Sequence, residues 1–463
     1  MRALVLAAGL GTRFMSEKPK VMHSILGKPM LWYALKAVKG LNPESIALVV
    51  GYKSEEIKNY FGDSYLYFHQ SNPKGGTGDA VLSAIEFWRD YQGYMLVING
   101  DSPLVRVNTI KGMLRYIRLV EEYEGIKLSA LLLSAQLPDP TGYGRVVKDQ
   151  EGNVLKVVEE KDASSEEKLI KEVNGGVYLF YCPHLLEALF KVKPSQKTGE
   201  VYLTEVFRIM AQMGYAVRSF MAEDPTEILG ANTRWELSIA ENIIRLGILQ
   251  GWAEKGNTLH QPESLWIEPE VELQGDVEVY PDAMLIGNTK IGKGVKIGKG
   301  SIVENSIVED GVIIEAYSIV RNSHIKAGAI VGPFAHVREN SLIGKESHVG
   351  NFVEVKKSFL GERAKAKHLA YIGDAEIEED VNVGAGVVFA NFDGKRKHPS
   401  YIGKGAFIGS NSLIVAPVRI GSYSFVAGGS VITKDVPDGD LAISRPKLKI
   451  LKDKGKKKLQ DLR

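Results

Sequence analysis

The sequence of 463 residues has little cysteine, little net charge and no long apolar run, and each shortage excludes a class of protein. The single cysteine, Cys182, excludes an intrachain disulfide framework and a cysteine-based zinc cluster. A net charge of +2 argues against a basic nucleic-acid-binding surface. No apolar stretch approaches the ~20 residues of a membrane span, and the short N-terminal run is a poor signal peptide. We therefore expect a cytoplasmic globular protein that binds neither nucleic acid nor membranes.

The first part of the chain, residues 1–228, alternates short β-rich runs with helical stretches. The expected strands are the runs at residues 3–8, 45–51, 95–100 and 128–135. The expected helices lie at residues 29–41 and 78–91. Strands that alternate with helices are typical of a doubly wound, mainly parallel sheet. We predict an N-terminal Rossmann-like domain, and thus an α/β fold class for this half.

The second part of the chain has a different periodicity. Residues 229–255 carry apolar side chains at three- and four-residue spacing, which predicts a connecting helix. Within residues 256–446, aliphatic or small residues recur every five or six positions. A six-residue step turns an α-helix by about 600°, so no helical face forms. One short strand and a turn per hexad is typical of a left-handed parallel β-helix.

Two stretches interrupt the hexads, residues 365–376 around His368 and residues 390–401. Because the interior of a solenoid tolerates no bulge, we expect both stretches to project as loops, where chemistry is often placed. The lysine-rich tail, residues 447–463, lacks core material and is expected to be a disordered, solvated segment.

The first strand leads into a glycine turn with two cations close behind. Gly9 and Gly11 are followed by Arg13 and Lys20. A strand, glycine turn and helix direct backbone N–H groups at an anion. The spacing is not the dinucleotide fingerprint, because Phe14 stands where its third glycine belongs, and the Walker loop is also absent. A plain strand–turn–helix joint explains the glycines but not the cations, so a phosphate site is favoured.

The stretch LAAGLGTRF…KPK resembles the signature of sugar-1-phosphate nucleotidyltransferases. From Leu6 to Arg445 the chain resembles one bacterial family, which joins UDP-N-acetylglucosamine pyrophosphorylase and glucosamine-1-phosphate N-acetyltransferase activities. The likeness includes GGTGDA, NGDSPL, DPTGYGRVV, NGGVY, GEVYLTE and GANTRWEL, and later HVGNFVEVKKS, HLAYIGDAEI, VNVGAGVVFANFDG and LAISR. The resemblance implies a bifunctional transferase. Acetyl-CoA would acetylate glucosamine 1-phosphate, and UTP would then uridylylate the product.

The resemblance implies that Arg13 and Lys20 are catalytic cations over the triphosphate. Cations are needed because a sugar-phosphate oxygen attacks the α-phosphorus of UTP, and repulsion between two polyanions opposes this step. Asp101 follows the strand at 95–100, where doubly wound sheets bind ligands. The resemblance makes Asp101 and Asn232 the Mg²⁺ ligands, and two protein oxygens suffice beside phosphate and water.

The same resemblance implies contacts to base and sugar. Gln70, Gly76 and Thr77 correspond to the uracil site, with Ser71 as an alternative to Gln70, because QSNPKGGTG is one residue longer than the family pattern. Glu159 is either a solvated acid or a strand-end residue in the cleft; its place after KVV favours the cleft. The remaining implied contacts are Leu6, Ala7, Ala8, Gly9, Asn99, Gly100, Gly144 and Asn174.

Arg338 and Lys356 are 18 residues apart, which is three hexads or one coil. The spacing alone therefore predicts that the two cations stack on one edge of the β-helix. The alternative is a pair of ordinary solvated cations, and the adjacent Lys357 shows that such residues are common here. The resemblance implies that the pair binds the phosphate of glucosamine 1-phosphate.

The resemblance identifies His368 as the base that takes a proton from the attacking amine, a role that suits imidazole near neutral pH. It implies further sugar contacts at Tyr371, Asn382, Asn391 and Phe392, where the family often has Tyr at the last position. Acetyl-CoA contacts are implied at Ala385, Ser410, Gly428 and Arg445. It also implies a homotrimer, because triangular β-helices present flat faces that pack around a threefold axis.

Two other readings of the sequence stay open. One is a different sugar-1-phosphate nucleotidyltransferase with a regulatory or structural β-helix. The other is a nonenzymatic subunit with a nucleotide-binding domain. The length of the β-helix argues against the first reading. The second is disfavoured because all the expected site residues are present, namely Arg13, Lys20, Asp101, Asn232 and His368.

Overall fold

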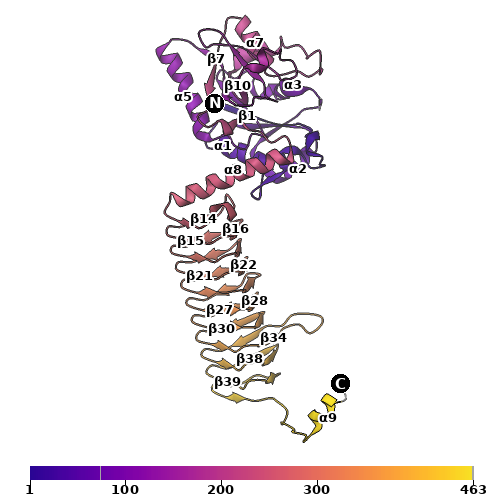
Figure 1. Ribbon diagram of the computed structural model, residues 1–463, viewed down its shortest axis with the longest axis vertical. Coiled ribbons are helices and arrows are strands. Elements are labelled where there is room, and N and C mark those ends of the chain that lie inside the picture. Colours follow the sequence, from indigo (N-terminus) through magenta and orange to yellow (C-terminus); the bar gives the residue numbers. More distant parts are fainter. Residues whose placement is uncertain (73, 461–463) are drawn as a thin grey trace. The chain divides into compact units, whose positions relative to one another are not determined.

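The structure is a computed structural model that describes residues 1–72 and 74–460 (Figure 1). It divides into two compact units, residues 1–244 and the chain from residue 245 onward. Each unit is described by itself. In the described residues, no helix is long and apolar enough to cross a membrane.

The first unit is built on a mixed sheet with the strand order β11-β7-β10-β6-β1-β4-β5. These strands are β1 Arg2–Ala7, β4 Ile46–Val50, β5 Leu66–His69, β6 Tyr94–Asn99, β7 Leu128–Gln136, β10 Glu172–Tyr181 and β11 Ala216–Met221. Strands β1, β4, β5 and β6 are parallel, which confirms the doubly wound core. Strand β10 runs antiparallel between β6 and β7, and it carries the hairpin of β8 Arg145–Lys148 and β9 Val154–Val158.

Helices cover both faces of this sheet. They are α1 Met30–Lys39, α2 Ser54–Phe61, α3 Gly76–Ser83, α4 Ile85–Trp88, α5 Val107–Tyr123, α6 Cys182–Leu189 and α7 Glu205–Gln212. Alternate residues of a strand point to opposite faces. Accordingly, Val5 packs into a core with residues of α1 and α5, and Leu4 into a second core with residues of α3, α6 and α7. Burial on both faces explains why β1 is a continuous apolar run.

The second unit is the predicted β-helix. Three parallel sheets form its sides, and each coil from β12 to β38 contributes one strand to each sheet. Sheet I runs from β12 Thr258–Leu259 to β41 Leu441–Ala442, sheet II from β13 Trp266–Ile267 to β40 Val431–Ile432, and sheet III from β14 Glu272–Leu273 to β38 Val418–Ile420. The hexad aliphatics fill the axis: Val331, Val349 and Ala366 are fully buried in successive coils. The hexapeptide β-helix is therefore confirmed.

One of the two expected interruptions is wrong. The chain around His368 continues the coil, because Ile372, Ile377, Val383 and Phe389 carry the buried series onward. The five- and six-residue steps between them are the same as elsewhere in the solenoid. His368 ends β30 Lys365–His368, a regular strand of sheet I. Of the two stretches, only the second contains a loop: the chain between β34 Val388–Ala390 and β35 Ser400–Ile402 leaves the coil and projects beside β34 (Figure 1).

The tail also differs from the expectation of disorder. Residues Lys454–Gln460 form the short helix α9, because lysine, leucine and glutamine favour helix. All seven residues are exposed, so the helix contributes no core. Residues 461–463 of this predicted segment lie outside the described residues.

Candidate active sites

A cavity of about 490 Å³ opens at the carboxyl ends of β1 and β6 in the first unit. This is the edge where doubly wound sheets bind ligands. Ten of the predicted residues line it: Leu6, Ala8, Gly9, Lys20, Gln70, Gly76, Thr77, Asn99, Asp101 and Glu159. Ala7 instead packs into the core on the opposite face of the sheet, and the Gly100 N–H donates to the carbonyl of Leu6.

Four predicted residues form one charged network at this cavity. The Lys20 ammonium donates to a carboxylate oxygen of Asp101 and, over 2.7 Å, to Oδ1 of Asn232. The Arg13 guanidinium donates to the same Asn232 oxygen over 2.9 Å. Lys20 is nearly buried, whereas Arg13 is exposed. Arg13 and Lys20 thus share an oxygen of a residue that lies more than 200 positions further along the chain.

Two local devices hold this network in place. Gly11 has a φ of +59°, and a Cβ added there would lie 2.6 Å from Cβ of Lys20. Only glycine therefore lets the turn pass so close to that lysine. On the other side, Asn232 precedes helix α8 Arg234–Ala253. Glu236 accepts the N–H groups of Asn232 and Thr233, and the Thr233 hydroxyl accepts the N–H of Glu236, which is a capping box.

The donor set at this network fits a magnesium ion. The carboxylate of Asp101 and the amide oxygen of Asn232 both reach the Lys20 ammonium, so they converge on one point suited to a cation. Oxygen donors are the ligands that Mg²⁺ prefers, and it uses few of them beside phosphates. The described residues contain no group of three or more His, Cys, Asp or Glu side chains that could hold a metal.

Gln70 lies at the end of β5 on the side of the predicted base site. Its amide nitrogen donates to the carbonyl of Gly76 over 3.0 Å and to Asp79 over 2.8 Å, and the side chain is buried. Ser71, the alternative to Gln70, is exposed. The Gln70 side chain is thereby fixed against the start of α3.

The predicted sugar residues lie on the β8–β10 side. The Asn174 N–H donates to the carbonyl of Gly144 over 2.9 Å, and its side chain donates to the Tyr178 hydroxyl over 2.7 Å. Glu159 accepts a hydrogen bond of 2.8 Å from the Thr204 hydroxyl. Burial raises the pKa of Glu159, as expected for a carboxyl group in a cleft rather than on an open surface.

Some cavity residues escaped prediction. Lys74, Glu200 and Tyr202 also line the cavity. Glu200 and Tyr202 come from the stretch GEVYLTE, where Val201 exchanges backbone hydrogen bonds with Gly75 and Gly78. The glycine stretch at residues 75–78 is predicted to bind the nucleotide. GEVYLTE belongs to the same resemblance but has no predicted role, so its polar residues were the signal that could have identified Glu200 and Tyr202.

In the second unit, the predicted cation stack is confirmed. Arg338 in β25 His336–Arg338 is the register partner of Lys356 in β28 Glu354–Lys356, one coil on in sheet II. Arg338 donates to Glu354 over 2.7 Å, and Lys356 lies 3.4 Å from Glu339. Both cations are mostly buried along their side chains.

A glycine in the next coil makes room between these cations and two predicted sugar residues. Gly373, in β31 Tyr371–Gly373, is the register partner of Lys356. A Cβ on Gly373 would lie 2.6 Å from both the Tyr371 hydroxyl and Nδ2 of Asn391. Asn391 is held by its own hydrogen bond of 2.6 Å to Asp374. The cations Arg338 and Lys356 and the neutral donors Tyr371 and Asn391 thus surround one small space at Gly373.

The loop at 390–401 adds a cation that sequence reasoning missed. Lys397 adjoins Lys356, and a hydrogen-bonding contact with Lys356 lowers the pKa of Lys397. Asp393 fixes the loop by accepting the N–H groups of Lys395 and Arg396 over 2.7 and 2.8 Å, and His398 lies 2.7 Å away. These bonds lower the pKa of Asp393 to about 2.

The corner between sheets I and II collects the predicted acetyl-CoA residues. His368 ends β30, and Ala385, Ser410 and Gly428 follow β33 Asn382–Val383, β36 Phe407–Ile408 and β39 Phe425–Val426 at the same corner. Successive coils are joined there by hydrogen bonds from Asn411 N to Ala385 O and from Gly429 N to Ser410 O. Arg445 donates to the Gly428 carbonyl over 3.0 Å. The column extends ~14 Å from His368 to Gly428.

Two predicted residues lie apart from these clusters. Asn382 is on sheet I, where its register partners are Lys365 and Phe407, so it lies on a different side from Arg338 and Lys356. The ring of Phe392 is 60% exposed, and its backbone bridges to Lys397. Within one chain, the predicted acetyltransferase residues therefore divide between two faces.

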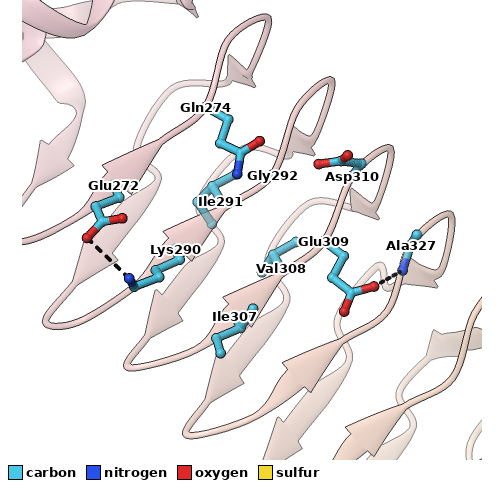
Figure 2. Close-up of a pocket in the computed structure, with 10 residues that line it drawn as sticks. All are labelled: Glu272, Gln274, Lys290, Ile291, Gly292, Ile307, Val308, Glu309, Asp310 and Ala327. Atoms are coloured by element: carbon cyan, nitrogen blue, oxygen red, sulfur yellow. Dashed lines mark hydrogen bonds and ion pairs between the residues drawn. The ribbon is translucent and has the colours of Figure 1, made fainter.

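Another groove, of about 310 Å³, lies on sheet III and holds none of the predicted residues (Figure 2). Its charged side chains are satisfied within the chain. Glu272 lies 3.3 Å from Lys290, and Glu309 accepts the Ala327 N–H over 3.1 Å (Figure 2). Asp310 accepts the Lys293 N–H over 2.7 Å. We assign this groove no ligand.

Sequence comparisons agree with the two-part fold. The family described as Nucleotidyl transferase matches residues 2–259, the GMPPB C-terminal domain matches 267–361, and Bacterial transferase hexapeptide (six repeats) matches 399–434.

Three curated relatives match over 98% or more of their own length, and each is named Bifunctional protein GlmU. The relative from Aquifex aeolicus is 58% identical over 99% of this chain and 100% of its own. The relative from Hydrogenobaculum sp. is 56% identical over 99% and 100%, and one from Thermus thermophilus is 44% identical over 98% of each. On these identities and this coverage, the chain belongs to the GlmU family of bifunctional enzymes, which combine uridylyl transfer with N-acetylation in one polypeptide.

Proposed function

We propose that the cavity of the first unit carries out uridylyl transfer through Lys20, Arg13, Asp101 and Asn232. The observation that supports this proposal is their single charged network at the carboxyl end of β6. Lys20 and Arg13 neutralise the triphosphate while a phosphate oxygen of N-acetylglucosamine 1-phosphate attacks the α-phosphorus and pyrophosphate leaves. Mg²⁺, held by Asp101 and Asn232, supplies further positive charge to the phosphates when bound. Gln70, Gly76 and Thr77 hold the base, and Gly144, Glu159 and Asn174 hold the sugar.

The acetyl transfer site is proposed for sheet II and its corner with sheet I. Arg338, Lys356 and Lys397 bind the phosphate of glucosamine 1-phosphate, and Tyr371 and Asn391 bind its sugar. Acetyl-CoA lies along the column from His368 to Arg445. The amine attacks the thioester carbonyl, His368 takes the amine proton, and the coenzyme A thiol leaves. Since UTP and acetyl-CoA are substrates made inside the cell, a cytoplasmic location follows.

Arg338→Ala and Lys356→Ala test the phosphate assignment. Each change should raise the KM for glucosamine 1-phosphate about ten- to hundredfold, because one charge-assisted contact contributes roughly 1.5–3 kcal/mol. Release of free thiol from acetyl-CoA measures the reaction. Lys357→Ala is the matched control, since Lys357 is 70% exposed and lies 3.9 Å from Asp374. If the KM for acetyl-CoA rises by the same factor, the two cations do not serve the phosphate.

A homotrimer is proposed because the acetyltransferase residues of one chain are divided between faces. His368 and Asn382 lie on sheet I, whereas Lys356 and Asn391 lie toward the far edge of sheet II. The corner above His368 also exposes a ladder of apolar side chains, with Tyr317, Phe334 and Phe352 stacked at 5.4 Å between ring centroids. A neighbouring copy would cover this ladder and complete each site.

Complementation of inactive variants tests the shared site. Asn391→Ala and His368→Ala chains are denatured together and refolded as mixed trimers. Because some mixed trimers would contain one site with both native residues, part of the thiol release should return. Each variant refolded alone is the control. An active monomer in sedimentation, or mixed trimers without recovered activity, would contradict shared sites for this pair.

A further inference from the structure

Asn351 stands directly above His368 in the β-helix. Asn351 ends β27 His348–Asn351, and the two residues are register partners in the parallel strands β27 and β30, which lie side by side (Figure 1). The Asn351 carbonyl also accepts the N–H of Leu369 over 2.9 Å. Partners in a parallel register project their side chains to the same side of the sheet. The amide of Asn351 therefore flanks the imidazole of His368.

The side-chain oxygen of Asn351 is buried and, among the described residues, has no hydrogen-bond partner. Such an atom is unusual, because buried polar groups are almost always satisfied. The neighbouring His368 ring is exposed, and no hydrogen bond to it is found in the described part of the chain. Oδ1 of Asn351, an acceptor without a partner, thus lies next to the His368 ring, whose N–H donor also has none in the described residues.

We propose that Asn351 is a positioning residue for His368, and that its Oδ1 accepts the Nδ1–H of the imidazole. The bond would fix the tautomer in which Nε2 carries the lone pair, which is the form a general base requires. The other column positions at this corner bear Ala385, Ser410 and Gly428, which leave space for acetyl-CoA. The proposal rests on the assignment of His368 as the base.

Two substitutions distinguish this role from a structural one. Asn351→Leu keeps the volume but removes the acceptor. It should lower kcat of acetyl transfer about ten- to hundredfold, by analogy with the outer partners that orient metal-binding histidines, with little change in the KM of either substrate. Asn351→Asp keeps an acceptor and adds a negative charge. It should retain most of the rate and move the acidic limb of the kcat profile up by about one pH unit, because a nearby anion raises the imidazole pKa.

A titratable neighbour of His368 provides the control variant. His348 and Lys367 both lie near this corner, since Lys367 and His368 act on the pKa of His348, which burial lowers. His348→Gln should leave the pH profile of acetyl transfer in place. Thermal melting and acetyl-CoA binding by calorimetry monitor the fold of each variant.

The outcomes distinguish a failure of the positioning role of Asn351 from a failure of the assignment of His368 as the base. An unchanged kcat in Asn351→Leu, or an unshifted profile in Asn351→Asp, while His368→Ala is inactive, would overturn the positioning role. Full activity in His368→Ala would instead overturn the assignment of the base. If Asn351→Leu does not fold, the profile of Asn351→Asp decides alone.

Discussion

Replacing His368 by alanine is expected to lower kcat of acetyl transfer by about a hundred- to ten-thousandfold, the usual contribution of a general base. The attacking amine must lose a proton, and His368 stands where the column of small corner residues meets sheet II. Pyrophosphate release from UTP should keep its rate, because every residue of that network belongs to the first unit. Thiol release and pyrophosphate release are measured on the same preparation.

A matched histidine controls for the loss of an imidazole. His324 lies on the β-helix, 2.8 Å from Glu309 and in sheet III, so His324→Ala should leave both activities intact. Loss of both activities in a folded His368→Ala protein would refute the two-site assignment.

Asp101→Ala should have the opposite effect. It removes the carboxylate that pairs with Lys20, so uridylyl transfer should fall about a hundred- to thousandfold. Thiol release from acetyl-CoA should be nearly unchanged. Asp101→Asn keeps one oxygen without the charge, so its rate should recover in part as Mg²⁺ is raised well above the wild-type requirement.

Asp90 supplies the control for this experiment. Its side chain is 90% exposed beside Arg89, and Asp90→Ala should preserve both reactions. If Asp101→Asn shows the wild-type dependence on Mg²⁺, the carboxylate does not serve the metal.

Periodicity explains why the β-helix was predictable in detail. In a solenoid, sequence distance converts directly into spatial distance. The 18-residue interval from Arg338 to Lys356 therefore predicts that the two residues are neighbours in adjacent coils, and the strand register confirms this prediction. The same arithmetic failed around His368, where the sequence predicts an interruption at residues 365–376. Ile372 follows Ala366 by six residues and Ile377 follows Ile372 by five, and both are buried, so the series continues through this stretch.

The first site was less accessible to such reasoning. Its strands and the turn at Gly9–Gly11 follow from local patterns. The approach of Val201 to Gly75, which brings Glu200 and Tyr202 to the cavity, depends on how distant segments pack across the sheet. No local spacing encodes that contact. Lys397 was missed for a related reason, because the bonds of Asp393 that shape its loop are not periodic.

The capping box at the start of α8 bears on how such a chain could be divided or inherited in pieces. Asn232 is held by Glu236, four residues further on, inside a helix that reads in sequence as a mere connector. A gene fragment ending at residue 228 would encode the whole sheet but omit both residues. The first turn of α8 thus belongs to the uridylyltransferase module, and a fission point that preserves it must come after Glu236.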